Sequence, residues 1–261
     1  MKTGFEDLDE IINIEEPQLI LLTGTNFIEE LSGDIANNVC LKQECEVLEV
    51  VSCKKEYLIK RMLVNEADVN YKNWTLKDKY SDKELQQIGQ ATVNLIEVTK
   101  RLPTIIEQDF NLYNLKEVVK LVSDFANHYA DRGIPANTLV VLDIVPLNSQ
   151  HKGRYRKQIL KLIKDLKKIS IKLRYPIIFI DNIDISKKHN TDNNTYNYLT
   201  KEHIDNINKI NKYVDTFIIV NSDNEQRDIF NVDVYDTKAK IGTCKLKYDF
   251  SCRKFEDYNN I

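Results

Sequence analysis

Glycine and proline are scarce in this chain, with seven and five among 261 residues. Glycine lets a backbone close tightly around a phosphate group, so few positions of the sequence are suited to a phosphate cradle. Cysteine pairs of the CxxC type are absent and the cysteines are odd in number, which argues against a zinc knuckle or a disulfide framework. We interpret all five as buried or incidental thiols: Cys40, Cys45, Cys53, Cys244 and Cys252.

Long apolar segments are also absent. No stretch approaches the length needed to cross a bilayer, and the first ten residues, MKTGFEDLDE, lack the apolar centre of a signal peptide. The sequence therefore predicts a cytoplasmic protein with no membrane contact. Its 42% hydrophobic and 30% charged residues are typical of a globular protein, and its length suits a single domain over residues 1–261.

Histidine motifs of the HxH or HxxxH type are missing, so we predict no metal site. The four histidines are expected to be surface side chains: His128, His151, His189 and His203. A large excess of charge is missing as well. A net charge of −3 excludes a protein that coats nucleic acid by bulk electrostatics. One stretch is nevertheless strongly basic, because residues 152–174 contain ten lysines and arginines and a single acid, Asp165.

Short apolar runs alternate with helical patterns, which predicts an α/β fold with a mainly parallel sheet flanked by helices. The expected strands are residues 18–23, 46–51, 139–142, 176–180 and 216–220, and the expected helices are residues 57–66, 82–95, 115–130 and 155–173. Two further runs, residues 229–235 and 243–250, lack a helical period and are expected to form antiparallel strands at one edge of the sheet. The polar residues 189–197 are expected to form a loop.

The segment 18–39 has the outline of a phosphate-binding loop, because an apolar strand breaks at Gly24 and leads into an amphipathic helix. Its residues do not suit a phosphate. Phe27 and Ile28 stand in the turn, and Glu29 and Glu30 would repel a triphosphate. The alternative interpretation is a capped helix whose first-turn acids complement the helix dipole. We expect the two apolar residues to fill the space that a nucleotide would occupy.

The opening residues TGFEDLDEII resemble the TGFxxLD entry of the C-terminal domain of DnaB-type replicative helicases. Four later segments resemble, in order, the family's second strand and SLEM turn, its Walker B strand, its PVIALSQLN strand and the strand pair that carries its KxR finger. These segments are residues 47–74, 139–147, 175–184 and 236–249. The resemblance implies a RecA-like P-loop NTPase topology. It also implies that the family's N-terminal helical domain is absent, since Met1 lies almost at the linker motif.

The resemblance implies catalytic positions that this sequence has largely lost. The Walker lysine corresponds to Ile28 and the magnesium-binding hydroxyl to Glu29, and the carboxylate that orients the attacking water corresponds to Lys54. The Walker B aspartate is kept as Asp143. The polar sensor corresponds to Asn182, and the trans-acting finger corresponds to Lys238 and Lys240, which cannot reproduce the bidentate fork of arginine. Loss of lysine, base and finger together predicts hydrolysis at background level.

Besides a structural remnant with no nucleic-acid contact, two functions remain open at this point. The first is a catalytically degenerate DnaB-like domain, a non-hydrolysing accessory or interaction protein in DNA replication or mobile-element maintenance, with no cofactor. Its possible partners are a replicative helicase or loader, single-stranded DNA and further copies of itself. The second is an active ATP-dependent replicative DNA helicase (5'-3') with an unorthodox nucleotide loop, which would need ATP and Mg²⁺.

The start of the basic stretch corresponds to the family's DNA-facing loop. It combines positive charge with one aromatic ring, which suits backbone tracking and base stacking on single-stranded DNA. The candidate residues are Lys152, Arg154, Tyr155 and Arg156. A solvated lysine-rich helix face is the competing interpretation.

Overall fold

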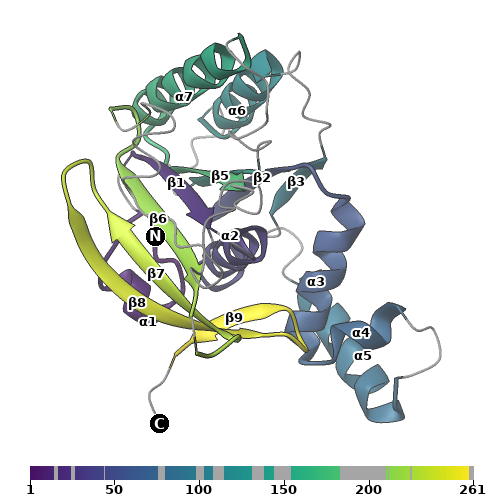
Figure 1. Cartoon of the computed structure of the whole chain (residues 1–261). Helices are drawn as coiled ribbons and strands as arrows, with labels where there is room; N and C mark the ends of the chain where they lie inside the picture. Colours follow the sequence, from purple (N-terminus) through teal and green to yellow (C-terminus); the bar gives the residue numbers. More distant parts are fainter. Residues whose placement is uncertain are drawn as a thin grey trace.

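The computed structural model of the chain describes residues 1–14, 17–24, 27–43, 45–75, 80–97, 103–107, 115–130, 138–143, 154–182, 210, 212–223 and 225–258. In this part of the chain the strands form one nine-stranded sheet in the order β3-β2-β4-β5-β1-β6-β7-β8-β9 (Figure 1). The strands are β1 (Leu19–Gly24), β2 (Glu46–Val51), β3 (Thr104–Glu107), β4 (Thr138–Asp143), β5 (Ile177–Asn182), β6 (Thr216–Ser222), β7 (Ile229–Tyr235), β8 (Lys240–Asp249) and β9 (Lys254–Asp257).

The first six strands of this order are parallel, and β6 to β9 are antiparallel. Strand β1 lies in the middle, where it pairs with β5 on one side and β6 on the other. All six residues of β1 and of β4 are buried, as expected for parallel strands covered on both faces. The predicted α/β fold with antiparallel C-terminal edge strands is thus confirmed.

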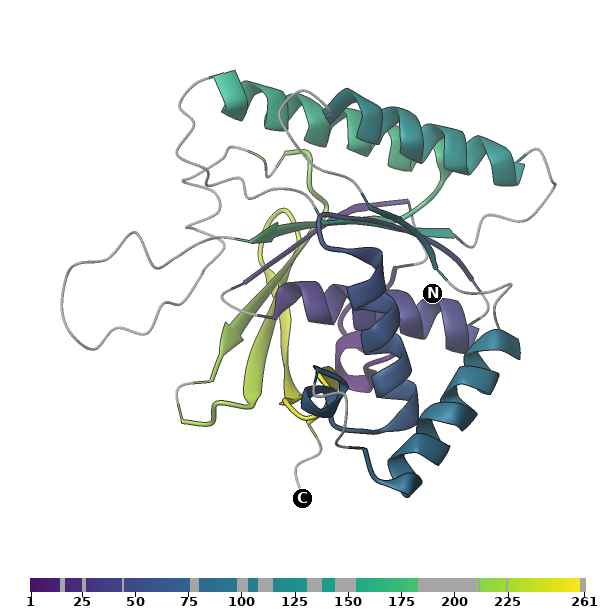
Figure 2. The same ribbon diagram turned by 90° about the vertical axis from the view of Figure 1, so that its right-hand side faces the viewer.

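Helices cover both faces of the sheet (Figure 2). Helices α6 (Leu115–Ala130) and α7 (Arg154–Leu173) lie on one face, and α2 (Ile28–Asn37) lies on the other. Helix α2 continues into a π-helical turn, Asn38–Lys42. Helix α3 (Lys55–Ala67) packs against α5 (Asp82–Glu97), and with α4 (Tyr71–Thr75) these helices extend beyond the end of the sheet.

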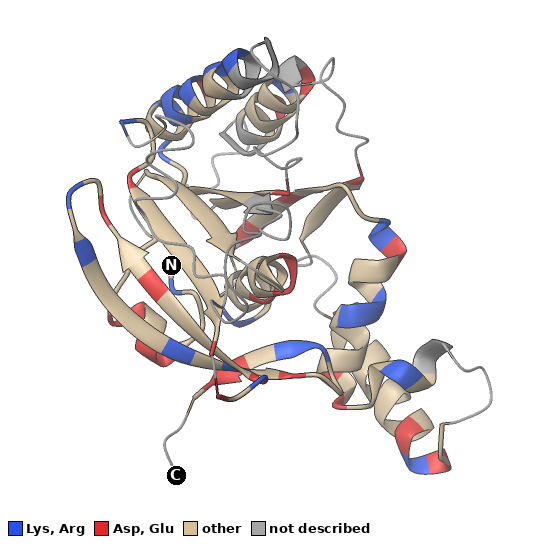
Figure 3. Cartoon of the chain, in the orientation of Figure 1, with Lys and Arg blue, Asp and Glu red and all other residues tan. Residues whose placement is uncertain are grey.

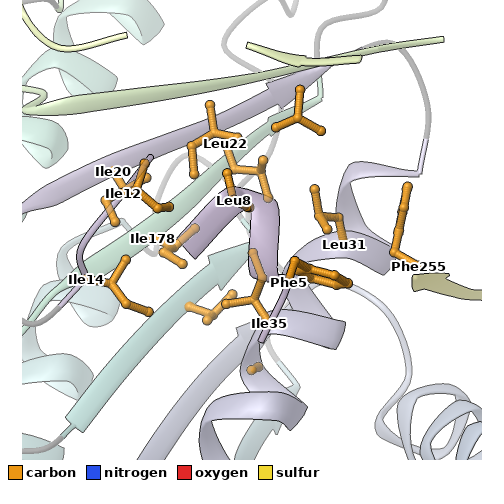
Figure 4. Packing of buried hydrophobic residues seen from close by; sticks show 14 of the residues in the cluster. Phe5, Leu8, Ile12, Ile14, Ile20, Leu22, Leu31, Ile35, Ile178 and Phe255 are labelled. Atoms are coloured by element: carbon orange, nitrogen blue, oxygen red, sulfur yellow. The ribbon is translucent and has the colours of Figure 1, made fainter. Parts of the chain in front are cut away.

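Two apolar cores follow from the alternation of side chains along the strands. On β1, Ile20 and Leu22 join the core beneath α2, whereas Leu19 and Leu21 join the core beneath α6 and α7. The short helix α1 (Glu6–Asp9) contributes Leu8 to the first core, close to Leu31 and Ile35 of α2 (Figure 4). The opening residues thus anchor the chain to the helix that follows β1.

Strand β3 was not predicted, because it has four residues and of these only Ile105 is fully buried. The predicted loop at residues 189–197 lies outside the described residues. His128 lies on α6 with an exposed side chain, and the other histidines lie outside the described part of the chain. Four cysteines are buried, Cys53 is half-buried, and all are free thiols. No helix in the described ranges is long and apolar enough to cross a membrane.

Candidate functional site

The turn between β1 and α2 is short, since β1 ends at Gly24 and α2 begins at Ile28. A side chain at Gly24 would place its Cβ 2.4 Å from the carbonyl oxygen of Val220 on β6 and 2.7 Å from Cγ2 of Ile28. Glycine is therefore required here by packing between neighbouring strands. Close packing against Val220 and Ile28 explains the first glycine of the loop pattern without any contact to a phosphate.

Phe27 closes this turn with a left-handed backbone, φ 58°. Its ring stacks on Tyr248 with ring centres 4.4 Å apart, and it meets Phe230 and Phe250 edge-on, both at 5.7 Å. The left-handed conformation costs about 1–2 kcal/mol for a non-glycine residue, and each aromatic pair returns about 0.5–1.5 kcal/mol beyond its burial. The aromatic contacts thus hold the loop in this conformation.

Ile28 is 1% exposed, and Phe27 is half-buried against the core beneath α2. Ile28 packs in the core and the Phe27 ring turns toward the C-terminal strands, so the expectation that this pair fills the space of a nucleotide stays a prediction.

The position assigned to the missing lysine depends on where the count begins, and the resemblance places it at Ile28. Counted forward from Gly24, the pattern GxxxxGK[ST] places the lysine at Glu30, two residues beyond Ile28. With either count the loop lacks the phosphate-binding lysine, because the sequence contains no lysine or arginine between Lys2 and Lys42. No cation from the loop or from α2 can face a phosphate.

A cation enters the site from another helix. Arg61 of α3 is 2% exposed, and its Nη2 donates hydrogen bonds to Oδ1 of Asp34 and to the backbone carbonyl of Glu30, both at 3.1 Å. Its Nε has no hydrogen-bond partner and is buried. The guanidinium thereby ties α3 to α2 from within the protein.

Gly33 makes room for this contact. A Cβ on Gly33 would lie 2.2 Å from Nη2 of Arg61. Glycine in the middle of a helix costs about 1 kcal/mol relative to alanine, so its presence in α2 is explained by the guanidinium that lies against it.

Two buried carboxylates interact with the arginine: Asp34 through an ion pair and Glu49 through electrostatic attraction. Asp34 accepts a hydrogen bond from the backbone N–H of Phe255 on β9 at 2.8 Å, and Glu49 on β2 is 4% exposed. Burial raises the pKa of Asp34 to about 6, against the attraction of Arg61. Burial likewise raises the pKa of Glu49 to about 7, again opposed by Arg61. We call Asp34, Glu49 and Arg61 the buried triad.

Asp143 ends β4, as expected for a Walker B aspartate, and is 8% exposed. Its Oδ2 accepts hydrogen bonds from the hydroxyl of Ser52 at 2.7 Å and from the backbone N–H of Ser52 at 3.3 Å. Ser52 follows β2. The carboxylate is thus held by the turn after β2, and this bonding gives it a structural role.

The remaining predicted positions are dispersed. Lys54 is exposed at the start of α3, and Lys238 is exposed next to Asp236, whose side chain caps the turn after β7. Lys240 forms an ion pair with Asp233 on the neighbouring strand at 2.6 Å. Asn182 ends β5 opposite Gly24. The side chains of Asn182, Lys152, Arg154, Tyr155 and Arg156 lie outside the described part of the structure.

The space left between these groups measures about 20 Å³, enough for about one water molecule. It is lined by the buried triad residues Arg61 and Glu49, by the acids Glu29, Glu30 and Asp143, and by Cys53 and Tyr57. Mg²⁺–ATP requires cations and backbone N–H groups around its phosphates, so these residues do not fit it. In the described ranges, no group of three or more His, Cys, Asp and Glu side chains is placed to hold a metal ion.

The sequence analysis missed the buried triad. One signal was available, because Arg61 shares a helical face with Leu58 and Met62 at i, i+3 and i+4 spacing, and both of these are buried. Gly33 inside a helical pattern was a second signal. Neither identifies the partner, since Arg61 and Asp34 lie 27 residues apart.

Comparison with known proteins agrees with the family resemblance of the sequence. The family model of the DnaB-like helicase C-terminal domain matches residues 1–257. One solved ATPase domain is similar, with a TM-score of 0.75, 14% identity, and coverage of 98% of this chain and 90% of that chain. The RadB recombinase has a TM-score of 0.54 and 12% identity, with 99% of both chains covered. No curated protein matches the sequence.

A DnaB-like replicative helicase, solved with a description of its interactions with primase, also has a TM-score of 0.75 at 14% identity. The match covers 98% of this chain and 61% of that chain, so this chain spans about three fifths of that helicase. At such identities the structural likeness establishes the RecA-like fold. Because the family model matches nearly the whole chain, this protein belongs to the DnaB-like helicase C-terminal domain family.

Proposed function

We propose that this chain is a DnaB-like helicase domain that has lost nucleotide chemistry. It acts as a non-hydrolysing accessory or interaction protein in DNA replication or mobile-element maintenance. One observation carries the proposal: the buried guanidinium of Arg61, held by Asp34 and the Glu30 carbonyl, lies against the middle of α2 and lines a space of only about 20 Å³ together with acidic side chains. A triphosphate needs a wider space with cations and backbone N–H groups facing it.

Three further features support the same conclusion. Lys54 stands where a carboxylate would orient the attacking water, so no base acts from that position. Lys240 is paired with Asp233 of its own chain and, as a lysine, cannot reproduce the bidentate fork of an arginine finger. One oxygen of the Asp143 carboxylate, Oδ2, accepts two hydrogen bonds from Ser52, which gives this aspartate a structural role. These features concern different parts of the hydrolytic machinery.

The partners follow from the family. A domain with the fold of a helicase motor and no motor chemistry suits a role in which its surfaces bind a true helicase, a helicase loader, another copy of itself or single-stranded DNA. Because the site is closed by side chains, we expect such binding to be independent of ATP.

A nucleotide titration tests the proposal. We expect a fluorescent ATP analogue with Mg²⁺ to show no saturable binding up to millimolar concentration, and no phosphate release with or without single-stranded DNA. A close, active family member assayed in parallel is the positive control. Micromolar binding with DNA-stimulated release would overturn the proposal.

That outcome would favour an active ATP-dependent 5'-3' DNA helicase. Two observations support this second candidate: Asp143 is retained at the end of β4, and the order of the family's segments is kept. The variant Asp143→Asn distinguishes the two functions, because it would abolish turnover in an enzyme and leave partner binding unchanged in an accessory protein.

A further inference from the structure

The exposed face of α7 is a straight row of lysines. Five lysines follow one another at i, i+4, i+7, i+11 and i+15, and all five side chains are exposed: Lys157, Lys161, Lys164, Lys168 and Lys172. At about 100° per residue they fall within an arc of roughly 80°, and at about 1.5 Å per residue they span about 22 Å. Figure 3 shows the basic residues along the outer side of α7. We call these five residues the lysine row.

Acidic partners for the row are few. Among the described residues, the one ion pair made by the row joins Lys168 to Asp165 at 3.7 Å, and the Lys168 side chain in that pair is 79% exposed. Lysines three and four residues apart repel each other and destabilise a helix. The row contains four such neighbouring pairs in a protein whose net charge is −3. The repulsion between these lysines does not stabilise the fold. A negatively charged ligand would neutralise it.

The row extends onto the next element. Tyr213, which precedes β6, lies under the ammonium groups of both Lys164 and Lys212, at 5.1 and 5.3 Å from its ring centre. A hydrogen bond from Lys164 lowers the pKa of the Tyr213 hydroxyl. Lys212 thus adds a sixth exposed cation beside the row, and the tyrosine ring is engaged by ammonium groups.

The ligand must be a polyanion with regularly spaced charges. A helix that lies within a lipid surface inserts an apolar face, but Leu162, Ile163 and Leu166 of α7 are buried in the core. Among the described side chains of α7, Ile171 alone is apolar and exposed beside the row. An acidic protein surface has no fixed charge spacing, whereas nucleic acid presents phosphates at regular intervals along a straight path, about one charge per 1.7 Å of duplex axis.

We propose that the lysine row binds the phosphate backbone of nucleic acid, independently of base sequence. The surface lies on the sheet face opposite α2, so it is separate from the closed nucleotide site (Figure 2). It also differs from the predicted DNA-facing residues Lys152, Arg154, Tyr155 and Arg156, of which the last three belong to the start of α7, since it begins at Lys157 and runs along the helix. This inference deepens the proposed function by naming a partner and the surface that holds it.

The test measures binding by fluorescence anisotropy, without nucleotide, for labelled single strands and for duplexes of matched length, in salt from about 50 to 200 mM. For five contacts we expect a log–log salt slope of about −4.5 with duplex and about −3.5 with single strands. The triple variant K161Q/K168Q/K172Q should reduce the duplex slope to about −1.8 and weaken binding by at least about tenfold.

A matched control removes the same amount of charge elsewhere. Lys55, Lys60 and Lys83 are exposed on α3 and α5, and K55Q/K60Q/K83Q should retain the wild-type slope. Equal losses in both triple variants would mean bulk electrostatics and would overturn the proposal. So would an absence of DNA binding by the wild type at low salt, or row-dependent sedimentation with anionic lipid vesicles in place of DNA binding. Since no nucleotide is present, an active ATPase would refute the proposed function and leave this result unaffected.

Discussion

Helices α2 and α7 cover opposite faces of the same sheet and stand in opposite relations to charge. Beneath α2 the charged groups are buried and held by one another, as in the contact of Arg61 with Asp34. On α7 the cations of the lysine row are exposed and repel their neighbours. Charge near α2 therefore serves the fold, whereas charge on α7 is available to a ligand.

The largest effect is expected from Arg61→Met. This change leaves Asp34 and Glu49 buried without their cation, which should lower the free energy of unfolding by about 3–5 kcal/mol. Urea denaturation at neutral pH measures it. The exposed neighbour Lys60→Met is the control and should change stability by less than about 0.5 kcal/mol. A loss below about 1 kcal/mol for Arg61→Met would show that the arginine does not hold this region together.

The free energy of unfolding should fall as pH rises, because two buried acids have raised pKa values. The pKa values of Asp34 and Glu49 are raised to about 6 and about 7 from 3.8 and 4.5. At a pH between the unfolded and the folded pKa of each acid, the folded state binds more protons than the unfolded state. Stability therefore falls as pH rises. We expect a decrease of about 3 kcal/mol from pH 5.5 to pH 8 in urea denaturation.

The variant Glu49→Gln sharpens this assignment. It should flatten the upper part of the pH profile and raise stability at pH 8 by about 1–2 kcal/mol, because a desolvated carboxylate is removed. An unchanged slope between pH 6 and 8 in this variant would assign the titration to other groups.

A smaller effect, with a change of sign, is expected from Gly33→Ala. In the wild type the new methyl group meets Arg61, and we expect a loss of about 1–3 kcal/mol. In an Arg61→Ala background the obstacle is gone, and the same change should stabilise α2 by up to about 1 kcal/mol through helix propensity. Thermal unfolding of the four proteins tests this. Equal effects in both backgrounds would contradict the contact.

The smallest effect on stability is expected on α7. The variant K161Q/K168Q/K172Q should unfold at the same temperature as the wild type or slightly above it, because about 0.2–0.5 kcal/mol of repulsion is relieved for each like-charged pair. Calorimetry measures this. A clear destabilisation would mean that these lysines serve the fold, as the charges beneath α2 do.

The sequence predicted most of the fold. Apolar runs predicted β2 with its observed bounds and the other long parallel strands to within a few residues, since buried parallel strands form continuous apolar runs. The lack of a helical period predicted the antiparallel β7 with its observed bounds and β8 to within a few residues. The four-residue β3 carried too little pattern.

At the site, the absence of lysine could be read directly, but the replacement could not. The contact of Arg61 with Asp34 joins two helices, and its geometry depends on tertiary packing that local periodicity does not contain. Ser52 is a similar case, because its bond to Asp143 spans 91 residues.

The central place of β1 has a consequence for synthesis of the chain on the ribosome. Its first sheet partner, β5, ends at Asn182, so 182 − 24 = 158 residues must be translated after Gly24 before β1 can be paired. At about 5–20 residues per second this takes roughly 8–30 s. During that interval the apolar Leu19–Leu22 run is an unpaired strand on a nascent chain, the kind of segment that chaperones protect from aggregation.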